Sequence, residues 1–237
     1  MKKETRLEYK YRISLFEYYR LKSDLQGFLE FDEFTLKAQR KKYLVRSLYY
    51  DTSNFREYSE KMTGENQRAK LRFRTYCEEK ENAEFVNVEL KTRNGSAVTK
   101  FVDRISTDEY DFFRKKKRWL GGVSSTLIEF ERRVRLGDLR PKLLVTYYRE
   151  GFKPKDKSNF RLTIDHEIAF SQTNELFVEK PNYRPKDPKI ILEIKTIDDG
   201  PDWIQRLVRR HSLKAVPNSK YAIGVEMTQD HIIPCLA

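Results

Sequence analysis

The sequence is poor in the residues that build metal-bound or disulfide-bonded scaffolds. Its 237 residues include only two cysteines, Cys77 and Cys235, and three histidines. The cysteines form no Cys-x-x-Cys pair and the histidines lie far apart, so we expect neither a zinc site nor a disulfide framework. No apolar stretch approaches the roughly 18 residues that a membrane-spanning helix needs. We therefore expect no membrane insertion and a cytoplasmic location.

Phosphate-binding loops and interdomain linkers are also missing. The chain has 9 glycines and 8 prolines, and none of them forms the GxxxxGK[ST] motif of a phosphate loop. No fixed-period repeat occurs, and no Gly/Ser-rich or Pro-rich stretch is long enough to separate two domains. The sequence therefore predicts a single domain over residues 1–237.

Positive charge is what the sequence has in excess. The 48 lysines and arginines outnumber the 36 acidic residues and give a formal net charge of +12. Aromatic residues make up 13% of the chain, which supplies enough apolar surface for a folded core. An excess of this size indicates an anionic partner, and charge alone leaves nucleic acid, an acidic membrane and polyphosphate open.

Alternation with a period of two residues is the strongest local pattern. In the stretch 4–12 the even positions are all Glu, Lys or Arg, while the odd positions from Leu7 on are apolar or aromatic. Such a pattern predicts a strand with one charged face. It recurs in the stretches 69–76, 85–93, 98–105, 160–168, 190–196 and 220–226. Two further stretches, 43–51 and 142–149, are rich in Tyr, Val and Leu, so the total is eight or nine strands.

Three stretches between the strands have helical spacing of apolar residues. They are 14–27, which opens with Ser14 as a predicted N-cap, 107–118, and 201–212. These amphipathic helices can cover the apolar side of the sheet.

The fold prediction is α+β, with a closed antiparallel β-barrel of about eight strands that forms a basic tunnel, flanked by amphipathic helices. A barrel of this size normally fills its interior with apolar side chains, so charged residues inside need a ligand to offset their burial. The alternative is an open sheet whose charged face is solvated and whose apolar face is covered by the helices.

The composition of the charged faces indicates what such a tunnel binds. The basic residues on them are Arg6, Lys10, Arg12, Lys70, Arg72, Arg74, Lys91, Arg93, Lys100, Arg104, Arg161, Lys195 and Lys220. A minority of acids joins them, namely Glu4, Glu8, Glu89, Asp165, Glu193 and Glu226. Arginine and lysine bind phosphate, whereas carboxylates repel it unless a divalent metal lies between. The mixture therefore predicts a chain of phosphates with Mg²⁺ or Mn²⁺.

Seven short motifs follow one another in a recognisable order. They are RLEYKY (6–11), KLRFRTY (70–76), ELKT (89–92), YYR (147–149), RLTID (161–165), LEIK (192–195) and SKY (219–221). Their series, which covers nearly the whole chain, resembles the VTC domain. That is the polyphosphate polymerase domain of the vacuolar transporter chaperone complex, a branch of the triphosphate tunnel metalloenzymes with a CYTH-like fold. The first strand departs from the ExExK pattern of the wider superfamily, because Arg6 stands where the first Glu would be.

The resemblance implies a set of site residues, which we combine with the charged faces above. We assign catalytic roles to Lys10, Arg72, Arg74, Lys91, Arg149 and Lys220. Further phosphate-binding residues are Arg6, Lys70, Arg93, Lys100, Arg161 and Lys195. Glu193 is the metal ligand that the resemblance implies, and Glu8, Glu89 and Glu226 are its candidate helpers.

The function that this set predicts is metal-dependent phosphoryl transfer from ATP or another nucleoside triphosphate to phosphate or a growing polyphosphate. If water is the acceptor, the same site is an inorganic triphosphatase. A non-catalytic module that binds polyphosphate is the third possibility, and nucleic acid is the less favoured partner. The sequence leaves these three functions open.

Overall fold

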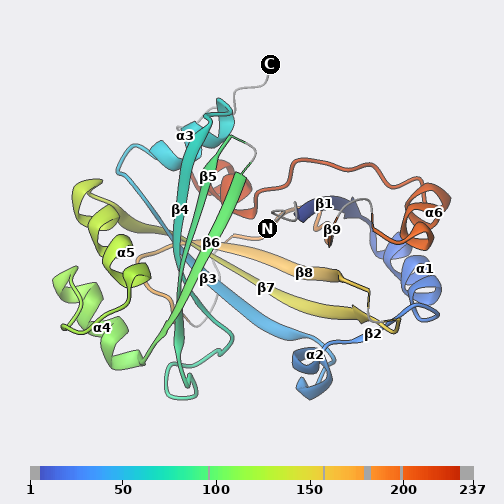
Figure 1. Ribbon diagram of the computed structural model, residues 1–237, viewed down its shortest axis with the longest axis horizontal. Helices are drawn as coiled ribbons and strands as arrows, with labels where there is room; N and C mark the ends of the chain where they lie inside the picture. Colours follow the sequence, from blue (N-terminus) through green and yellow to red (C-terminus); the bar gives the residue numbers. More distant parts are fainter. Residues whose placement is uncertain (1–5, 96, 157, 179–182, 198–199, 230–237) are drawn as a thin grey trace, which may run out of the picture. The chain divides into compact units, whose positions relative to one another are not determined.

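The structure is a computed structural model that describes residues 6–95, 97–156, 158–178, 183–197 and 200–229 (Figure 1). Its strands are β1 (Arg6–Ile13), β2 (Leu29–Phe31), β3 (Tyr43–Asp51), β4 (Gln67–Thr75), β5 (Val86–Asn94), β6 (Ala97–Ile105), β7 (Arg140–Pro154), β8 (Phe160–Gln172) and β9 (Ile190–Ile197). Its helices are α1 (Leu15–Leu25), α2 (Glu33–Lys37), α3 (Arg56–Met62), α4 (Thr107–Lys116), α5 (Ser125–Leu136), α6 (Asp202–Arg210) and α7 (Lys220–Thr228).

All nine strands belong to one sheet with the order β1-β9-β8-β7-β3-β4-β5-β6, and β2 pairs with β7 beside this path. The pairings whose register is described are antiparallel. The α+β class and the large antiparallel sheet are therefore confirmed. Within the described residues no strand pairing joins β6 to β1, so closure into a barrel is not confirmed and stays a prediction.

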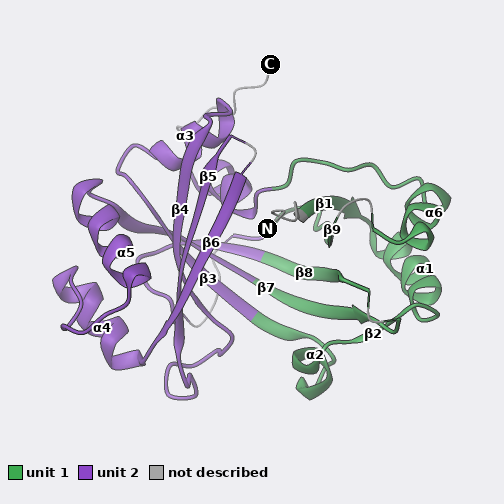
Figure 2. Ribbon diagram, viewed as in Figure 1, with its two compact units in different colours: residues 1–44, 147–168, 185–218 green, residues 45–146, 169–184, 219–237 purple. Residues whose placement is uncertain are grey.

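The chain forms two compact units that share strands β3, β7 and β8 (Figure 2). Unit 1 comprises residues 1–44, 147–168 and 185–218. Unit 2 comprises residues 45–146, 169–184 and 219–237.

The core of unit 1 lies between its strands and helices α1 and α6. Apolar residues of β1, β8 and β9, such as Ile13, Leu162 and Leu192, are buried together with Leu21 of α1 and Leu207 of α6. Alternation along each strand sends its charged residues to the other face. The helices thus cover the apolar side of these strands, as the sequence predicts.

Helix α1 begins where the sequence predicts. The Ser14 hydroxyl accepts a hydrogen bond from the Glu17 amide at 3.2 Å, and the Glu17 carboxylate accepts one from the Ser14 amide at 2.6 Å. This reciprocal capping box satisfies two amide groups that a helix start leaves without partners.

The core of unit 2 is built around one aromatic ring. Phe73 of β4 is buried, and its ring meets Tyr110 and Phe113 of α4 and Phe130 of α5 at centroid distances of 5.0, 5.8 and 5.1 Å. Helices α4 and α5 therefore pack on the apolar face of the β4–β5 pair. The cap of α4 is Ser106, one residue before the start that the sequence pattern predicts.

The prediction of a strand over 220–226 is wrong, because these residues form helix α7. A run of this length fits both the two-residue period of a strand and the roughly 3.6-residue period of a helix. Alternation places Tyr221 and Val225 on one face, and a helix buries the same two residues one turn apart. Ser219 decides in favour of the helix, since its hydroxyl accepts a hydrogen bond from the Ala222 amide. Gly224 then allows close packing, because a Cβ there would lie 2.5 Å from the side chains of Leu143 and Phe170.

Candidate functional site

The charged face of unit 2 is organised in rungs that cross β4, β5 and β6. Strand register places Lys70 opposite Lys91, and Lys91 opposite Lys100. Like charges that face each other across strands destabilise a sheet. Three lysines in one row therefore make this face strongly positive.

The next rung gathers cations around one carboxylate. Arg72 lies opposite Glu89, and its Nε donates to Glu89 Oε2 at 2.8 Å. Arg74 and Lys100 approach Oε1 of the same carboxylate at 3.5 and 3.2 Å. Burial alone would raise the pKa of Glu89, but these three cations outweigh burial and hold that pKa well below its usual range. Glu89 therefore carries a negative charge that fixes the position of two arginines.

Tyr49 of β3 is a residue that the sequence analysis missed. Its hydroxyl accepts a hydrogen bond from Arg72 Nη1 at 2.6 Å, and its ring stacks on Tyr221 with centroids 5.0 Å apart. Burial alone would raise its pKa, yet Arg72, Arg74 and Lys70 outweigh burial and lower the pKa to about 8. Its position in the sheet could have revealed this role, because strand pairing puts Tyr49 opposite Arg72.

The start of α7 lies against the lysine rung. Lys70 Nζ donates to Ser219 Oγ at 3.2 Å, and Lys220 is the first residue of α7. Although the strand prediction over 220–226 is wrong, Ser219 and Lys220 still lie in unit 2. The basic residues Lys70, Arg72, Arg74, Lys91 and Lys100 lie in the same unit.

The charged face of unit 1 alternates cations with anions. Lys10 lies opposite Glu193, and Glu8 lies opposite Lys195. Along each strand the signs alternate as well: Lys10 Nζ is 2.6 Å from Glu8 Oε1, and Lys195 Nζ is 2.8 Å from Glu193 Oε1. Phosphate-binding and metal-binding candidates are thus interleaved on β1 and β9.

Arg149 is fixed on this face by a buried carboxylate. Its Nε and Nη2 donate to the two oxygens of Asp165 at 2.6 and 2.8 Å, and Nη2 is 3.7 Å from Glu193 Oε2. Burial would lower the pKa of Arg149, but Asp165, Tyr147 and Glu193 together raise it well above its usual value. Asp165 is fully buried. A freely solvated charged face would leave this carboxylate exposed, so the solvated-sheet alternative does not describe this part of unit 1.

The oxygen donors of unit 1 fit one hard cation. Glu193 and Glu8 lie on the same face, and Thr163, which pairs with Glu193, has a buried hydroxyl oxygen without a hydrogen-bond partner among the described contacts. Mg²⁺ binds through one or two carboxylates and completes its shell with water and phosphate oxygens. Within the described residues no three His, Cys, Asp or Glu side chains are grouped for a metal.

The other two carboxylates proposed as metal ligands have different surroundings. Glu89 faces Arg72, Arg74 and Lys100, and Glu226 lies on α7, where it accepts a hydrogen bond from Tyr58 at 3.3 Å. Both belong to unit 2.

Two predicted phosphate-binding residues contact groups of the protein away from the lysine rung, and a third lies outside the described part. Arg161 is 3.2 Å from Asp32, and Arg93 Nε donates to the Gly95 carbonyl at 2.7 Å. The side chain of Arg6 lies outside the described residues.

Comparisons with known proteins agree with one another. A family model described as the VTC domain matches residues 5–229. Vacuolar transporter chaperone complex subunit 2 of Schizosaccharomyces pombe is 23% identical over 239 residues, which cover 80% of this chain and 32% of that protein. The chain thus spans about a third of the length of that relative.

The fold also has a solved counterpart. A putative adenylate cyclase from Bacillus halodurans superposes with a TM-score of 0.57 at 16% identity, over 92% of this chain and 96% of that chain. At this identity the likeness is one of fold. In the part of the chain that the structure describes, no helix has the length and hydropathy needed to cross a membrane.

Proposed function

The chain belongs to the VTC domain family, and from this premise we propose that it transfers phosphoryl groups from a nucleoside triphosphate such as ATP to phosphate or polyphosphate. The substrate's phosphate chain lies along the basic rungs, and Mg²⁺ or Mn²⁺ is the cofactor. Because the two units share β3, β7 and β8, we propose that residues 1–237 act as one domain.

The observation that carries the proposal is the rung of Lys70, Lys91 and Lys100. Neighbouring strands lie about 4.8 Å apart, so three rung positions span about 10 Å. That span suits a linear chain of several phosphates better than a single phosphate. The forks of Arg72 and Arg74 lie on the adjacent rungs and add the planar donors that bind phosphate oxygens in pairs.

The side chains supply positioning and charge neutralisation, which account for most of the catalysis in phosphoryl transfer. Glu89 and Tyr49 hold Arg72 in place, and Asp165 holds Arg149, so these guanidinium groups need little reorganisation when charge develops on the transferred group. Lys10, Lys91 and Lys220 add point charges. A divalent ion bound to Glu193 and Glu8 would add further neutralisation of the phosphate oxygens.

A polyphosphate-binding module without catalysis is the second candidate. The surroundings of Glu89 favour this candidate. Its contacts with Arg72, Arg74 and Lys100 hold these cations in position to bind an anion, and such binding requires no reaction. An inorganic triphosphatase would use the same residues with water as the acceptor.

One experiment separates these functions. The purified protein is incubated with ATP and Mn²⁺, and phosphate, triphosphate and long-chain polyphosphate are resolved on a gel. Glu193→Gln and Arg72→Ala are tested in parallel, with Arg135→Ala on the exposed side of α5 as the matched control. Long chains that disappear in the first two variants and persist in the control support the polymerase.

Release of phosphate without chains would assign the triphosphatase. Tight polyphosphate binding without turnover of ATP or triphosphate would overturn the enzyme proposal and leave the binding module.

A further inference from the structure

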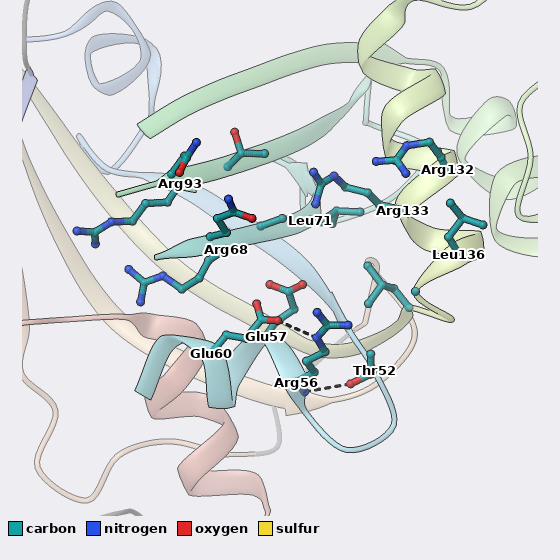
Figure 3. A pocket seen from close by; sticks show the side chains of 16 residues that line it. Thr52, Arg56, Glu57, Glu60, Arg68, Leu71, Arg93, Arg132, Arg133 and Leu136 are labelled. Carbon is teal, nitrogen blue, oxygen red and sulfur yellow. Dashed lines mark hydrogen bonds and ion pairs between the residues drawn. The ribbon is translucent and has the colours of Figure 1, made fainter. Parts of the chain in front are cut away.

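A charged pocket lies in unit 2, on the side of β4 and β5 that faces α5 (Figure 3). Its volume is about 630 Å³, and its walls come from α3, α5 and the two strands. Alternation along β4 places Ala69 and Leu71 on the pocket side, whereas Lys70 and Arg72 belong to the rungs on the opposite face. Arg68 and Arg93 also line the pocket, whereas Lys70, Arg72, Lys91 and Lys100 do not, so the pocket is distinct from the lysine rung that carries the proposed function.

Two helices bring arginines to this pocket. Arg56 comes from α3, and Arg132 and Arg133 come from α5. Arg132 and Arg133 share one carboxylate: Arg132 donates to both oxygens of Glu129 at 2.6 and 2.8 Å, and Arg133 Nε donates to Oε1 at 2.6 Å. One anion thus serves two cations, and a net positive charge remains at the α5 wall.

The guanidinium ends retain donors for a ligand. Arg56 uses its Nε on Glu60 at 2.7 Å, and Arg133 uses its Nε on Glu129. No hydrogen bond is described for the terminal Nη groups of Arg56 and Arg133. Figure 3 shows Glu57 beside Arg56, and Arg133 on the helix that also carries Arg132.

Glu57 is the group in the pocket whose bonding is incomplete. Its Oε2 is buried and has no hydrogen-bond partner among the described contacts. Burial, followed by the charges of Glu60 and Asp51, raises its pKa to about 8, although Lys70 and Arg56 oppose this. Near neutral pH this carboxyl group is therefore mostly protonated, so it does not repel an anion and can donate a hydrogen bond to one.

We infer that this pocket is a second binding site for a multiply charged phosphate anion, held by Arg56 and Arg133 with Arg132 at the rim. Guanidinium groups from two helices provide paired donors for phosphate oxygens. The volume accommodates several phosphate groups. This site goes beyond the proposed function, because Lys70, Lys91 and Lys100 do not line the pocket.

The rival explanation is a salt-bridged surface filled with water, and a titration distinguishes the two. Sodium tripolyphosphate is titrated calorimetrically into wild type, Arg72→Ala, the double variant Arg56→Ala/Arg133→Ala, and Arg135→Ala. Arg135 is a matched control, because it lies on the same helix and pairs with Glu131 four residues earlier, as Arg133 pairs with Glu129, but it does not line the pocket. Lys91→Ala replaces Arg72→Ala if the latter does not fold, as judged by its melting curve.

We expect two tripolyphosphate ions bound per chain in wild type and in Arg135→Ala. Each of the other variants should bind one ion, because the affinity of the lost site falls about tenfold or more. One ion per chain that Arg72→Ala abolishes and the double variant retains would overturn the second site and leave the proposed function intact. One ion that only the double variant loses would support the pocket and contradict the rung site. Equal weakening by Arg135→Ala and the double variant would show a surface-charge effect and overturn the inference.

The protonation of Glu57 gives a second readout. In the Arg72→Ala background, affinity at the pocket falls as pH rises above about 8, because Glu57 then becomes charged. Glu57→Gln abolishes this fall, since the amide stays neutral and keeps a donor. An unchanged pH dependence in Glu57→Gln would contradict the placement of the anion beside Glu57.

Discussion

The two units carry charged faces of different kinds. On β1, β8 and β9 of unit 1, Lys10 lies opposite Glu193 and Lys195 lies opposite Glu8, and Asp165 binds Arg149. On the β4–β5–β6 rungs of unit 2, as far as the structure describes them, Glu89 is the one carboxylate. Unit 1 thus pairs its cations with carboxylates, whereas the rungs of unit 2 carry mostly cations, and we propose that unit 2 takes an external anion. From this difference we propose that the phosphate chain lies mainly on the rungs of unit 2.

The largest expected effect tests the charge balance of unit 2. Glu89→Ala leaves Arg72, Arg74 and Lys100 around a vacated, buried position, and we expect a loss of about 4 kcal/mol in the free energy of unfolding. Because tripolyphosphate can replace the lost negative charge, it should restore more stability to this variant than to wild type. Urea unfolding with and without tripolyphosphate measures both effects. Equal stabilisation of variant and wild type would contradict the need for an external anion.

The second prediction applies the same test to unit 1. Asp165→Asn removes a buried partner of Arg149, and we expect a loss of about 3 kcal/mol. Tripolyphosphate should restore little of it, because Glu193 stays 3.7 Å from Arg149 and keeps the local charge near balance. The same urea experiment checks this. Restoration as strong as in Glu89→Ala would show that the two faces respond to phosphate alike.

The third prediction compares single lysines of the two faces. Lys91→Ala should weaken tripolyphosphate binding about tenfold, because a charged phosphate contact is lost. Lys195→Ala should weaken it about threefold or less, since Glu193 already neutralises that lysine. Both titrations use the Arg56→Ala/Arg133→Ala background, so that only binding outside the α3–α5 pocket is measured. A larger effect at Lys195 would move the phosphate chain to unit 1.

The smallest expected effect concerns the ionisation of Tyr49. Phenolate absorbance should show one tyrosine with a pKa of about 8, which is lost in Tyr49→Phe and moves upward in Arg72→Ala. Since the folded-state pKa lies below the ordinary value of 10, this group adds stability as pH rises from 8 to 10 and adds none below 8. A titration of wild type without a tyrosine near 8 would contradict the cationic surroundings of Tyr49.

The prediction from sequence succeeded where periodicity was long and one-sided. The stretch 43–51 is β3, and β4, β5, β6 and β9 lie within two residues of their predicted positions. Helices α2 and α3 were missed because their 5 and 7 residues are too short for a clear apolar stripe. Helix α5 was also missed, although Ser124 caps it and its buried residues Leu127, Phe130 and Val134 recur at helical spacing. The stretch 220–226 was wrong since a short run satisfies both periods.

The candidate site was predicted in part. The basic residues Lys70, Arg72, Arg74, Lys91 and Lys100 fall on one face of unit 2, as alternation requires. Tyr49 escaped notice because its neighbours in sequence are apolar and its role comes from Arg72 across the strand pair. The pocket with Arg133 and Glu57 was missed because its walls come from segments that lie far apart in the chain.

By itself, the sequence determined that the strands have one apolar and one ionic face, because side chains alternate strictly along an extended chain. It also determined the excess of positive charge. Only the tertiary structure decided which charges meet: register sets Lys70, Lys91 and Lys100 in one row, and it surrounds Glu89 with three cations. Register is a property of strand pairs, so the same alternating strands shifted by two residues would keep their faces and lose these contacts.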